Sequence, residues 1–374
     1  MTAEPRPEKS VSATGVPHAS CKATDRPVAA AKLPGLEALR CVAAACVLLL
    51  HARAVYGSPA ALGQSRLGAD LAWIFTGFGR GYLGVDFFLM LSGFLMAYIQ
   101  EPRLGRIQPN GKSASIWSFL VNRYRRLWPM MALGSVIGLP MLFVNTHGLM
   151  DFVWVGALNL ALLPALGQFF AFPLNIPAWT IFAELVVNAT HVLVLRHIAG
   201  RWLWVLLALS LPGMVWIAHH HGSLDLGAKP STLLPGLARC TFAYMTGMTY
   251  GRSWGAVPPL PVPPLLAFIA MPLTIWGAWR FHFSGWWPDM VFVLVICPLM
   301  LAGGLRLRRG GWIAGLAGAL AFPLFACQMP ILQGLQHLGF GYWAGIAGAL
   351  VGGMIAMAWQ MGFSRFRVQL RRKA

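Results

Sequence analysis

The chain has 374 residues, of which 57% are hydrophobic and 11% are charged. A soluble domain carries about 25% charged residues, so this composition excludes a water-soluble globular protein as well as a disordered one. The formal net charge of +18 in so apolar a chain indicates basic loops that face anionic lipid, and we expect no nucleic acid as a partner. The apolar runs are long and unbroken, unlike the alternating segments of about 10 residues in an outer-membrane barrel. The sequence therefore predicts an all-α, polytopic integral membrane bundle.

The two ends of the chain differ in composition from the part between them. Residues 1–33 are rich in Pro, Ala, Ser and Thr, which predicts a disordered cytoplasmic tail and not a cleavable signal. Residues 34–365 form the expected transmembrane domain, and residues 366–374 a short basic cytoplasmic tail. The six cysteines show no CxxC pair, so we expect neither a disulfide framework nor a metal site.

The number of membrane crossings follows from the basic residues between the apolar segments. If the N-terminus is cytoplasmic and 151–166 does not cross, 23 of the 29 Lys and Arg residues fall on the cytoplasmic side, as the positive-inside rule requires. We therefore expect about ten transmembrane helices, both termini cytoplasmic, and a re-entrant or interfacial piece at 151–166. The eleven apolar segments are 36–57, 81–100, 127–145, 151–166, 179–197, 203–219, 233–251, 264–280, 288–304, 312–334 and 340–362.

Ionisable residues inside the predicted spans are functional candidates, because a charge in the bilayer costs at least a few kcal/mol. His51, Asp86 and Glu184 fall well inside spans. The predicted topology places Arg40 near the cytoplasmic face and His51 about 16 Å further out, at 1.5 Å per helical residue. Asp86 and Glu184 follow soon after their spans enter from the outer side. We therefore expect these three ionisable groups to share one layer in the outer half of the membrane.

These residue types favour one kind of chemistry. A histidine beside a carboxylate can deprotonate a hydroxyl group near neutral pH. Arginine forks bind phosphate with two parallel hydrogen bonds, and Arg40 and 123–126 form a basic group at the expected cytoplasmic mouth. The arrangement suits a phosphorylated donor from the cytoplasm that meets an outward-facing acceptor inside the bundle.

Structural interpretations of the same residues stay open at this point. The arginines at 123–126 also serve as a stop signal for the third span, and His51 is also suited to a hydrogen bond with a neighbouring helix. The two acids could be partners of Arg80 or Arg53. His191, which has no acid one turn away, is expected to be structural.

Five stretches resemble motifs of the acyltransferase 3 family of membrane acyltransferases. GLEALRCVAAACVLLLH (35–51) is similar to the family's opening signature, in which an Arg and a His are separated by ten residues. The resemblance covers about residues 34–365. The other four stretches follow in the family's order: GVDFFLMLSGFLM (84–96), RYRRLWP (123–129), PAWTIFAELVVN (177–188) and LAFPLFACQMPI (320–331).

The resemblance implies a multi-pass enzyme of the bacterial inner membrane that moves an acyl group, commonly acetyl, from acyl-CoA to a hydroxyl of a carbohydrate. It implies a co-substrate, acetyl-CoA or another acyl-CoA, and no permanently bound cofactor or metal. The residues that carry over are His51, Asp86 and Glu184 for catalysis and Arg40, Arg123 and Arg126 for acyl-CoA. Ser92 and Trp179 are weaker candidates for donors to the oxyanion.

Departures from the family pattern bear on the acceptor. Gln328 stands where the family often has a histidine, Ala321 and Phe322 replace Ser-Tyr, and Leu185 replaces a second acid. Two other functions remain as alternatives: a transporter or flippase for a glycan or lipid-linked precursor, and a scaffold subunit without catalysis.

Overall fold

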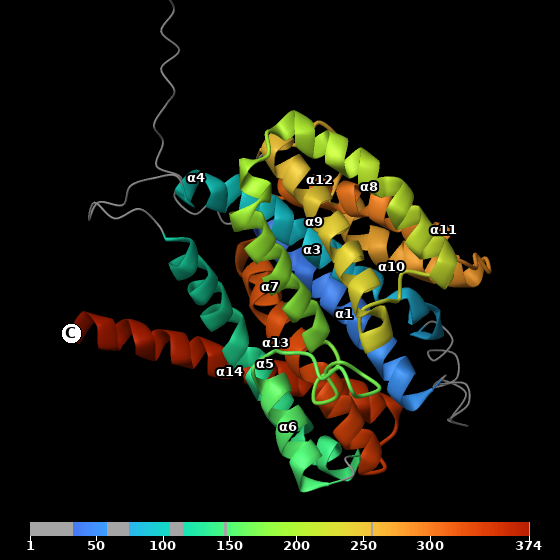
Figure 1. The fold of residues 1–374 in the computed structure, drawn as a ribbon, viewed down its shortest axis with the longest axis vertical. Helices are drawn as coiled ribbons and strands as arrows, with labels where there is room; N and C mark the ends of the chain where they lie inside the picture. Colours follow the sequence, from blue (N-terminus) through green and yellow to red (C-terminus); the bar gives the residue numbers. More distant parts are fainter. Residues whose placement is uncertain (1–32, 58–74, 105–114, 146–147, 256, 374) are drawn as a thin grey trace, which may run out of the picture. The chain divides into compact units, whose positions relative to one another are not determined.

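The computed structural model describes residues 33–57, 75–104, 115–145, 148–255 and 257–373. The predicted disordered tail therefore lies outside the described residues, apart from residue 33. The described residues are almost entirely helical and contain no strand, which confirms the all-α fold (Figure 1). The helices are α1 (Pro34–Tyr56), α3 (Leu83–Leu95), α4 (Glu101–Leu104), α5 (Ile116–Asn145), α6 (Leu149–Leu160), α7 (Ala178–Leu193), α8 (Gly200–His221), α9 (Leu233–Trp254), α10 (Pro264–Arg280), α11 (Trp287–Val291), α12 (Cys297–Arg306), α13 (Gly311–His337) and α14 (Tyr342–Lys373).

Eight helical runs of the described chain are long and apolar enough to cross a membrane. Two expected spans, 233–251 in α9 and 264–280 in α10, do not meet these requirements of length and hydropathy. α10 has 17 residues, and α9, with 22, is more polar and carries a fully buried arginine, Arg239. α6, within the segment expected not to cross, is a short apolar helix of 12 residues. The expected tail at 366–374 continues α14 as helix to Lys373.

α3 and α9 pack so closely that their backbones touch. A Cβ atom at Gly93 would collide with the carbonyl oxygen of Tyr244, and one at Gly247 with that of Met90. Small residues at such crossings let membrane helices approach each other, because lipid supplies no hydrophobic force between them. The polar helix α9 is thereby held inside the bundle beside α3.

α1 and α13 lie side by side and run in the same direction. Near one end, Gly318 packs on the Cβ of Glu37, and near the other, Gln336 Nε2 donates to the carbonyl oxygen of Val55 over 3.1 Å. In both contacts the two residues are 281 positions apart in the sequence. A residue of α13 therefore lies level with the α1 residue 281 positions before it.

The chain between α6 and α7 folds into the bundle. Phe172, Leu174 and Asn175 are fully buried, and Asn175 Nδ2 donates to the carbonyl oxygen of Ala326, in the middle of α13, over 2.7 Å. Residues 171–177 of this connection are buried or half-buried, whereas half of residues 161–170 are exposed, so the chain is already inside the protein where α7 begins. This buried segment sets how deep each residue of α7 lies in the bundle.

Candidate active site

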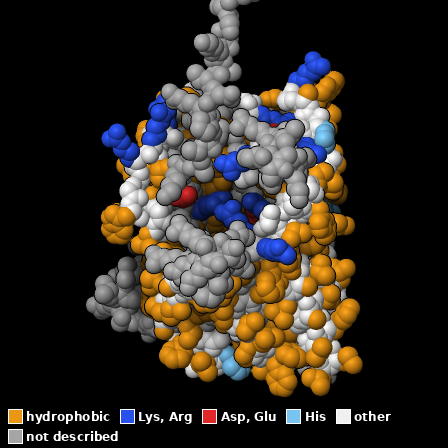
Figure 2. All heavy atoms as spheres, turned by 90° about the vertical axis from the view of Figure 1, so that its left-hand side faces the viewer, with side chains coloured by type: hydrophobic (Ala, Val, Ile, Leu, Met, Phe, Trp, Pro, Cys, Tyr) orange, Lys and Arg blue, Asp and Glu red, His pale blue; other side chains and the backbone are white. Residues whose placement is uncertain are grey.

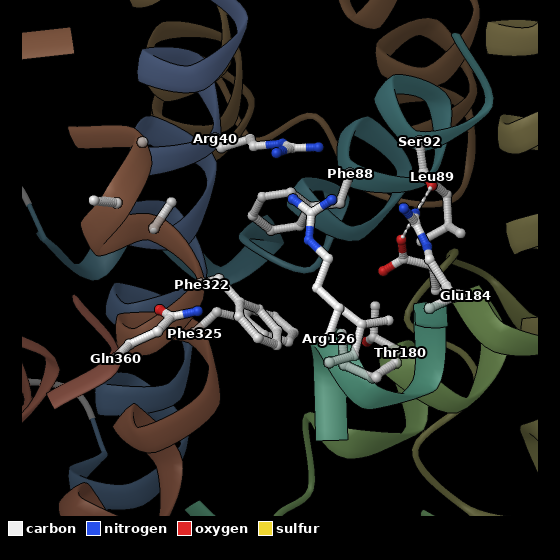
Figure 3. Close-up of a pocket in the computed structure, with 16 residues that line it drawn as sticks. Arg40, Phe88, Leu89, Ser92, Arg126, Thr180, Glu184, Phe322, Phe325 and Gln360 are labelled. Carbon is white, nitrogen blue, oxygen red and sulfur yellow. Dashed lines mark hydrogen bonds and ion pairs between the residues drawn. The ribbon is translucent and has the colours of Figure 1, made fainter. Parts of the chain in front are cut away.

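A cavity of about 220 Å³ lies among α1, α3, α5, α7, α13 and α14 (Figure 3). In Figure 3, the side chains of Arg40 and Arg126 reach from different helices toward the same space. Figure 2 shows a hollow lined by Lys and Arg side chains on the face where α5 and α14 stand in Figure 1. The cavity is lined by Arg40, Phe88, Leu89, Ser92, Arg123, Arg126, Leu127, Thr180, Ile181, Glu184, Gly318, Ala319, Ala321, Phe322, Phe325 and Gln360.

Three arginines and one carboxylate share this cavity, and we call them the cavity arginine cluster: Arg40, Arg123, Arg126 and Glu184. Arg123 pairs with Glu184 and also donates to Ser92 Oγ over 3.0 Å, while Ser92 Oγ donates to Glu184 Oε1 over 3.1 Å. Among the described residues, no carboxylate lies within ion-pair distance of Arg40 or Arg126. The cluster thus has two positive charges in excess, which is the electrostatic condition for binding an anion.

Glu184 does not lie where the expected layer would place it. Its carboxylate pairs with Arg123 and lines the same cavity as Arg40, toward the N-terminal end of α1 and away from His51. The expectation assumed that α7 starts at the membrane surface. Because the buried segment 171–177 precedes α7, Glu184 lies deeper and joins the arginines instead.

Asp86 has a partner that the sequence analysis missed. Arg239 of α9 donates from Nε to Asp86 Oδ1 over 2.8 Å and from Nη2 to Asp86 Oδ2 over 2.6 Å. Both side chains are buried, with exposed fractions of 0% and 1%. The expected partners, Arg80 and Arg53, are engaged elsewhere. Asp86 lies outside the cavity lining, so its predicted role beside His51 has no support from its contacts. An arginine in the middle of the apolar segment 233–251 was the signal that could have revealed the pair.

Arg80, whose side chain is 18% exposed, forms a second ion pair close to the first, with the buried Asp289. Tyr82 Oη donates to Asp289 Oδ2 over 2.8 Å, and the Leu224 amide donates to the same oxygen over 2.8 Å. Arg239 also donates to the carbonyl oxygen of Tyr82 over 2.8 Å, which links the two pairs. We call Asp86, Arg239, Arg80 and Asp289 the buried ion-pair cluster, in which each carboxylate has its own arginine.

His51 lies on the same face of α1 as Arg40. Eleven residues at 100° each return to within about 20° of the starting direction, and they advance about 16 Å along the axis. His51 is absent from the cavity lining, and its Nδ1 is buried with no hydrogen-bond partner among the described residues. The imidazole therefore lies outside the cavity, on the face of α1 that carries Arg40 and nearer the C-terminal end of that helix.

The remaining candidates differ in how their polar atoms are used. Ser92 is held by Arg123 and Glu184, and Trp179 packs against Gly227, outside the cavity lining. Thr180 lines the cavity, and its buried hydroxyl has no hydrogen-bond partner among the described residues. Gln328 is fully buried, and neither atom of its amide has a hydrogen-bond partner among those residues.

His191 has an acidic neighbour after all. Its Nε2 lies 3.1 Å from Glu101 Oε1, and Arg252 pairs with the same carboxylate. The contact joins α7 to α4, which are far apart in the sequence, so no pattern within one helix could indicate it. In the part of the chain that the structure describes, no group of three His, Cys, Asp or Glu residues could hold a metal ion.

Comparisons with known proteins agree with this architecture. The family model of the acyltransferase domain, acyltransferase 3, matches residues 33–365. A protein named "Protein 2 in picA locus" of Rhizobium radiobacter is 34% identical, over 30% of this chain and 68% of that protein. No solved structure matches the chain. With a match over nearly its whole described length and eight helices able to cross a membrane, the chain belongs to the acyltransferase 3 family and is a multi-pass membrane acyltransferase.

Proposed function

We propose that this acyltransferase takes an acyl group, acetyl in the first instance, from acyl-CoA at the cytoplasmic face of the bacterial inner membrane. The acceptor is a hydroxyl group of a carbohydrate or a glycan-like compound. The single observation that carries the proposal is the excess of two positive charges around the cavity. Membership of an acyltransferase family favours this function over a transporter or flippase and over a scaffold.

The donor argument rests on the charge and size of the cavity. Coenzyme A carries phosphate groups, and guanidinium forks are the side chains best matched to phosphate. A volume of about 220 Å³ is smaller than the roughly 300–1,000 Å³ of pockets that enclose a drug-sized ligand. The cavity therefore accommodates part of the donor: Arg40 and Arg126 would hold phosphate, and the thioester arm would extend along α1 toward His51.

Glu184 and Ser92 have a positioning role in this proposal. They fix the guanidinium of Arg123 by hydrogen bonds, so that its remaining donors face the cavity in a defined direction. A guanidinium that is already held in its binding orientation loses less conformational freedom when the ligand binds, so such supporting contacts raise affinity. Glu184 thus supports the binding of the donor and is not the general base.

His51 is the general base in this proposal. An imidazole whose ordinary pKa is near 6.5 can accept the proton of an attacking hydroxyl. The hydroxyl oxygen then bonds to the thioester carbonyl carbon, the carbon–sulfur bond breaks, and the departing thiolate takes the proton from the imidazolium. The unpartnered Nδ1 of His51 leaves that nitrogen available for such a transfer or for a bound water.

Transfer of labelled acetyl groups from acetyl-CoA, measured in membranes that carry the protein, tests this function. The H51Q variant is expected to lose at least 100-fold in transfer rate, since general-base catalysis contributes about 10²–10⁴, while binding of coenzyme A persists. His191→Gln, another buried histidine of a spanning helix, is the matched control and keeps its activity. Undiminished transfer by H51Q would remove His51 from the chemistry.

A further inference from the structure

An aromatic pair forms part of the cavity wall. Phe88 of α3 and Phe325 of α13 both line the cavity, and their rings meet edge to face with centroids 5.6 Å apart at an angle of 71°. Two rings in this geometry attract each other beyond their simple burial. The two rings therefore form a closed contact in the cavity lining.

The register between α1 and α13 gives the level of Phe325. A separation of 281 positions puts Phe325 level with Ala44 of α1. Ala44 lies one turn beyond Arg40 and two turns before His51, on the same face of the helix. Phe325 thus stands between the arginines and the histidine.

Phe88 meets Phe325 from α3, which runs opposite to α1, and its Cα lies one turn nearer the arginine end than that of Gly84. Gly84 packs on the carbonyl oxygen of Ala43 and on the side chain of Val47, so this part of α3 is level with the middle of α1. Phe88 lies one helical turn after Gly84 and one turn before Ser92, so the three residues share one face of α3. Ser92 belongs to the arginine end of the cavity, through its bond to Arg123.

We propose that the Phe88–Phe325 pair is the constriction through which the acyl end of the donor passes on its way to His51, and that it limits the size of the acyl group. This inference rests on the proposed function. The rings must turn or separate to let a thioester through, and a two-carbon acetyl group requires less space than a longer chain. One extra methylene group in a fitted apolar site changes selectivity by about 10–200-fold, so a short acyl group is the expected substrate.

The test compares acyl chains of different length on purified protein in lipid nanodiscs. Affinities for coenzyme A, acetyl-CoA, butyryl-CoA and hexanoyl-CoA are measured by titration, and transfer of the same labelled acyl groups is measured in membranes. For the wild-type protein we expect acetyl-CoA to be used best. For F325A and F88A we expect the preference for acetyl over hexanoyl to fall at least 10-fold, while affinity for free coenzyme A changes little. F325L and F88L, which disturb packing less, are expected to move the preference in the same direction.

Phe94→Ala provides the matched control. Phe94 lies on the same helix as Phe88, is fully buried and packs against Tyr98 at 5.7 Å, but it does not line the cavity. It is expected to lower stability without changing the acyl preference. If coenzyme A binds and the preference is the same in the wild-type protein and all four cavity variants, the inference is wrong and the proposed function stands. If coenzyme A does not bind the wild-type protein, both are wrong.

Discussion

Two groups of charged side chains lie inside the same helical bundle, and they differ in how completely they are paired. In the buried ion-pair cluster, Asp86, Arg239 and Asp289 are at most 1% exposed and Arg80 is 18% exposed, and each carboxylate has its own arginine. In the cavity arginine cluster, one carboxylate serves three arginines, and the paired side chains are each 17% exposed. A charge-balanced group needs no further partner, whereas the unbalanced one keeps a charge that a ligand of opposite sign can neutralise.

The same contrast separates the consequences of substitution. Removing one member of a closed pair leaves an uncompensated charge in a site without water, which is strongly destabilising. Removing an arginine from the open cluster instead relieves repulsion between like charges. Variants of the first cluster should therefore fail to fold well, while variants of the second should fold and lose binding.

The largest effect is expected at Asp86. The D86N variant leaves Arg239 without a counter-charge and should lower the free energy of unfolding by about 3–5 kcal/mol. A thermal melt of the purified protein in detergent measures this as a large fall in melting temperature. Asp151→Asn, on the short helix α6, is the control and should melt close to the wild type. An unchanged melting temperature for D86N would show that the pair contributes no stability.

A smaller effect is expected at Glu184, because its pair with Arg123 adjoins a cavity. The E184Q variant keeps a hydrogen-bonding side chain but loses the charge, and should cost about 1–2 kcal/mol of stability. Its affinity for coenzyme A should fall several-fold, since Arg123 is no longer fixed. Both are measured, by thermal melt and by titration, beside Asp151→Asn, which loses a carboxylate that has no ion pair among the described residues and does not line the cavity. A loss of stability as large as that of D86N would remove the distinction between the clusters.

Arg126 should affect binding alone. We expect R126Q to melt at or above the wild-type temperature and to bind coenzyme A about 10-fold more weakly, which corresponds to about 1.4 kcal/mol. Arg125→Gln is an adjacent control, because Arg125 is exposed and does not line the cavity. Equal affinities for these two variants would contradict the assignment of Arg126 to the donor site.

The smallest effect is expected at Asn175, which ties the buried connection to α13. Loss of one neutral hydrogen bond in N175A should cost about 1 kcal/mol. Because this connection sets where α7 begins, affinity for coenzyme A should also fall slightly. A melt and a titration that both match the wild type would show that the depth of Glu184 does not depend on this bond.

Much of the cavity arginine cluster could be predicted from the sequence because its signals are local. Arg40 and His51 share a face by helical spacing alone, and 123–126 is a basic run at the start of an apolar segment. The structure brings three members of the predicted basic group, Arg40, Arg123 and Arg126, to one cavity, whereas Arg125 does not line it. Their roles toward coenzyme A stay predictions.

The pairing of Asp86 could not be predicted, because its partner is 153 residues away on a helix that contacts α3 only in the folded bundle. The depth of Glu184 could not be predicted either, since hydropathy marks where an apolar segment begins but not whether a buried connection precedes it. α9 shows the same limit: its low apolarity reflects Arg239, which is paired inside the protein and never meets lipid.

The most direct measurement is a titration of the wild-type protein and R40Q with coenzyme A and with pantetheine, which has the same thiol arm without the nucleotide phosphates. The excess of arginine charge predicts that the wild-type protein binds coenzyme A at least 100-fold more tightly than pantetheine, and that this ratio falls about 10-fold in R40Q. Equal affinities for the two compounds, or a ratio that R40Q leaves unchanged, would contradict a phosphate-binding role for the cavity.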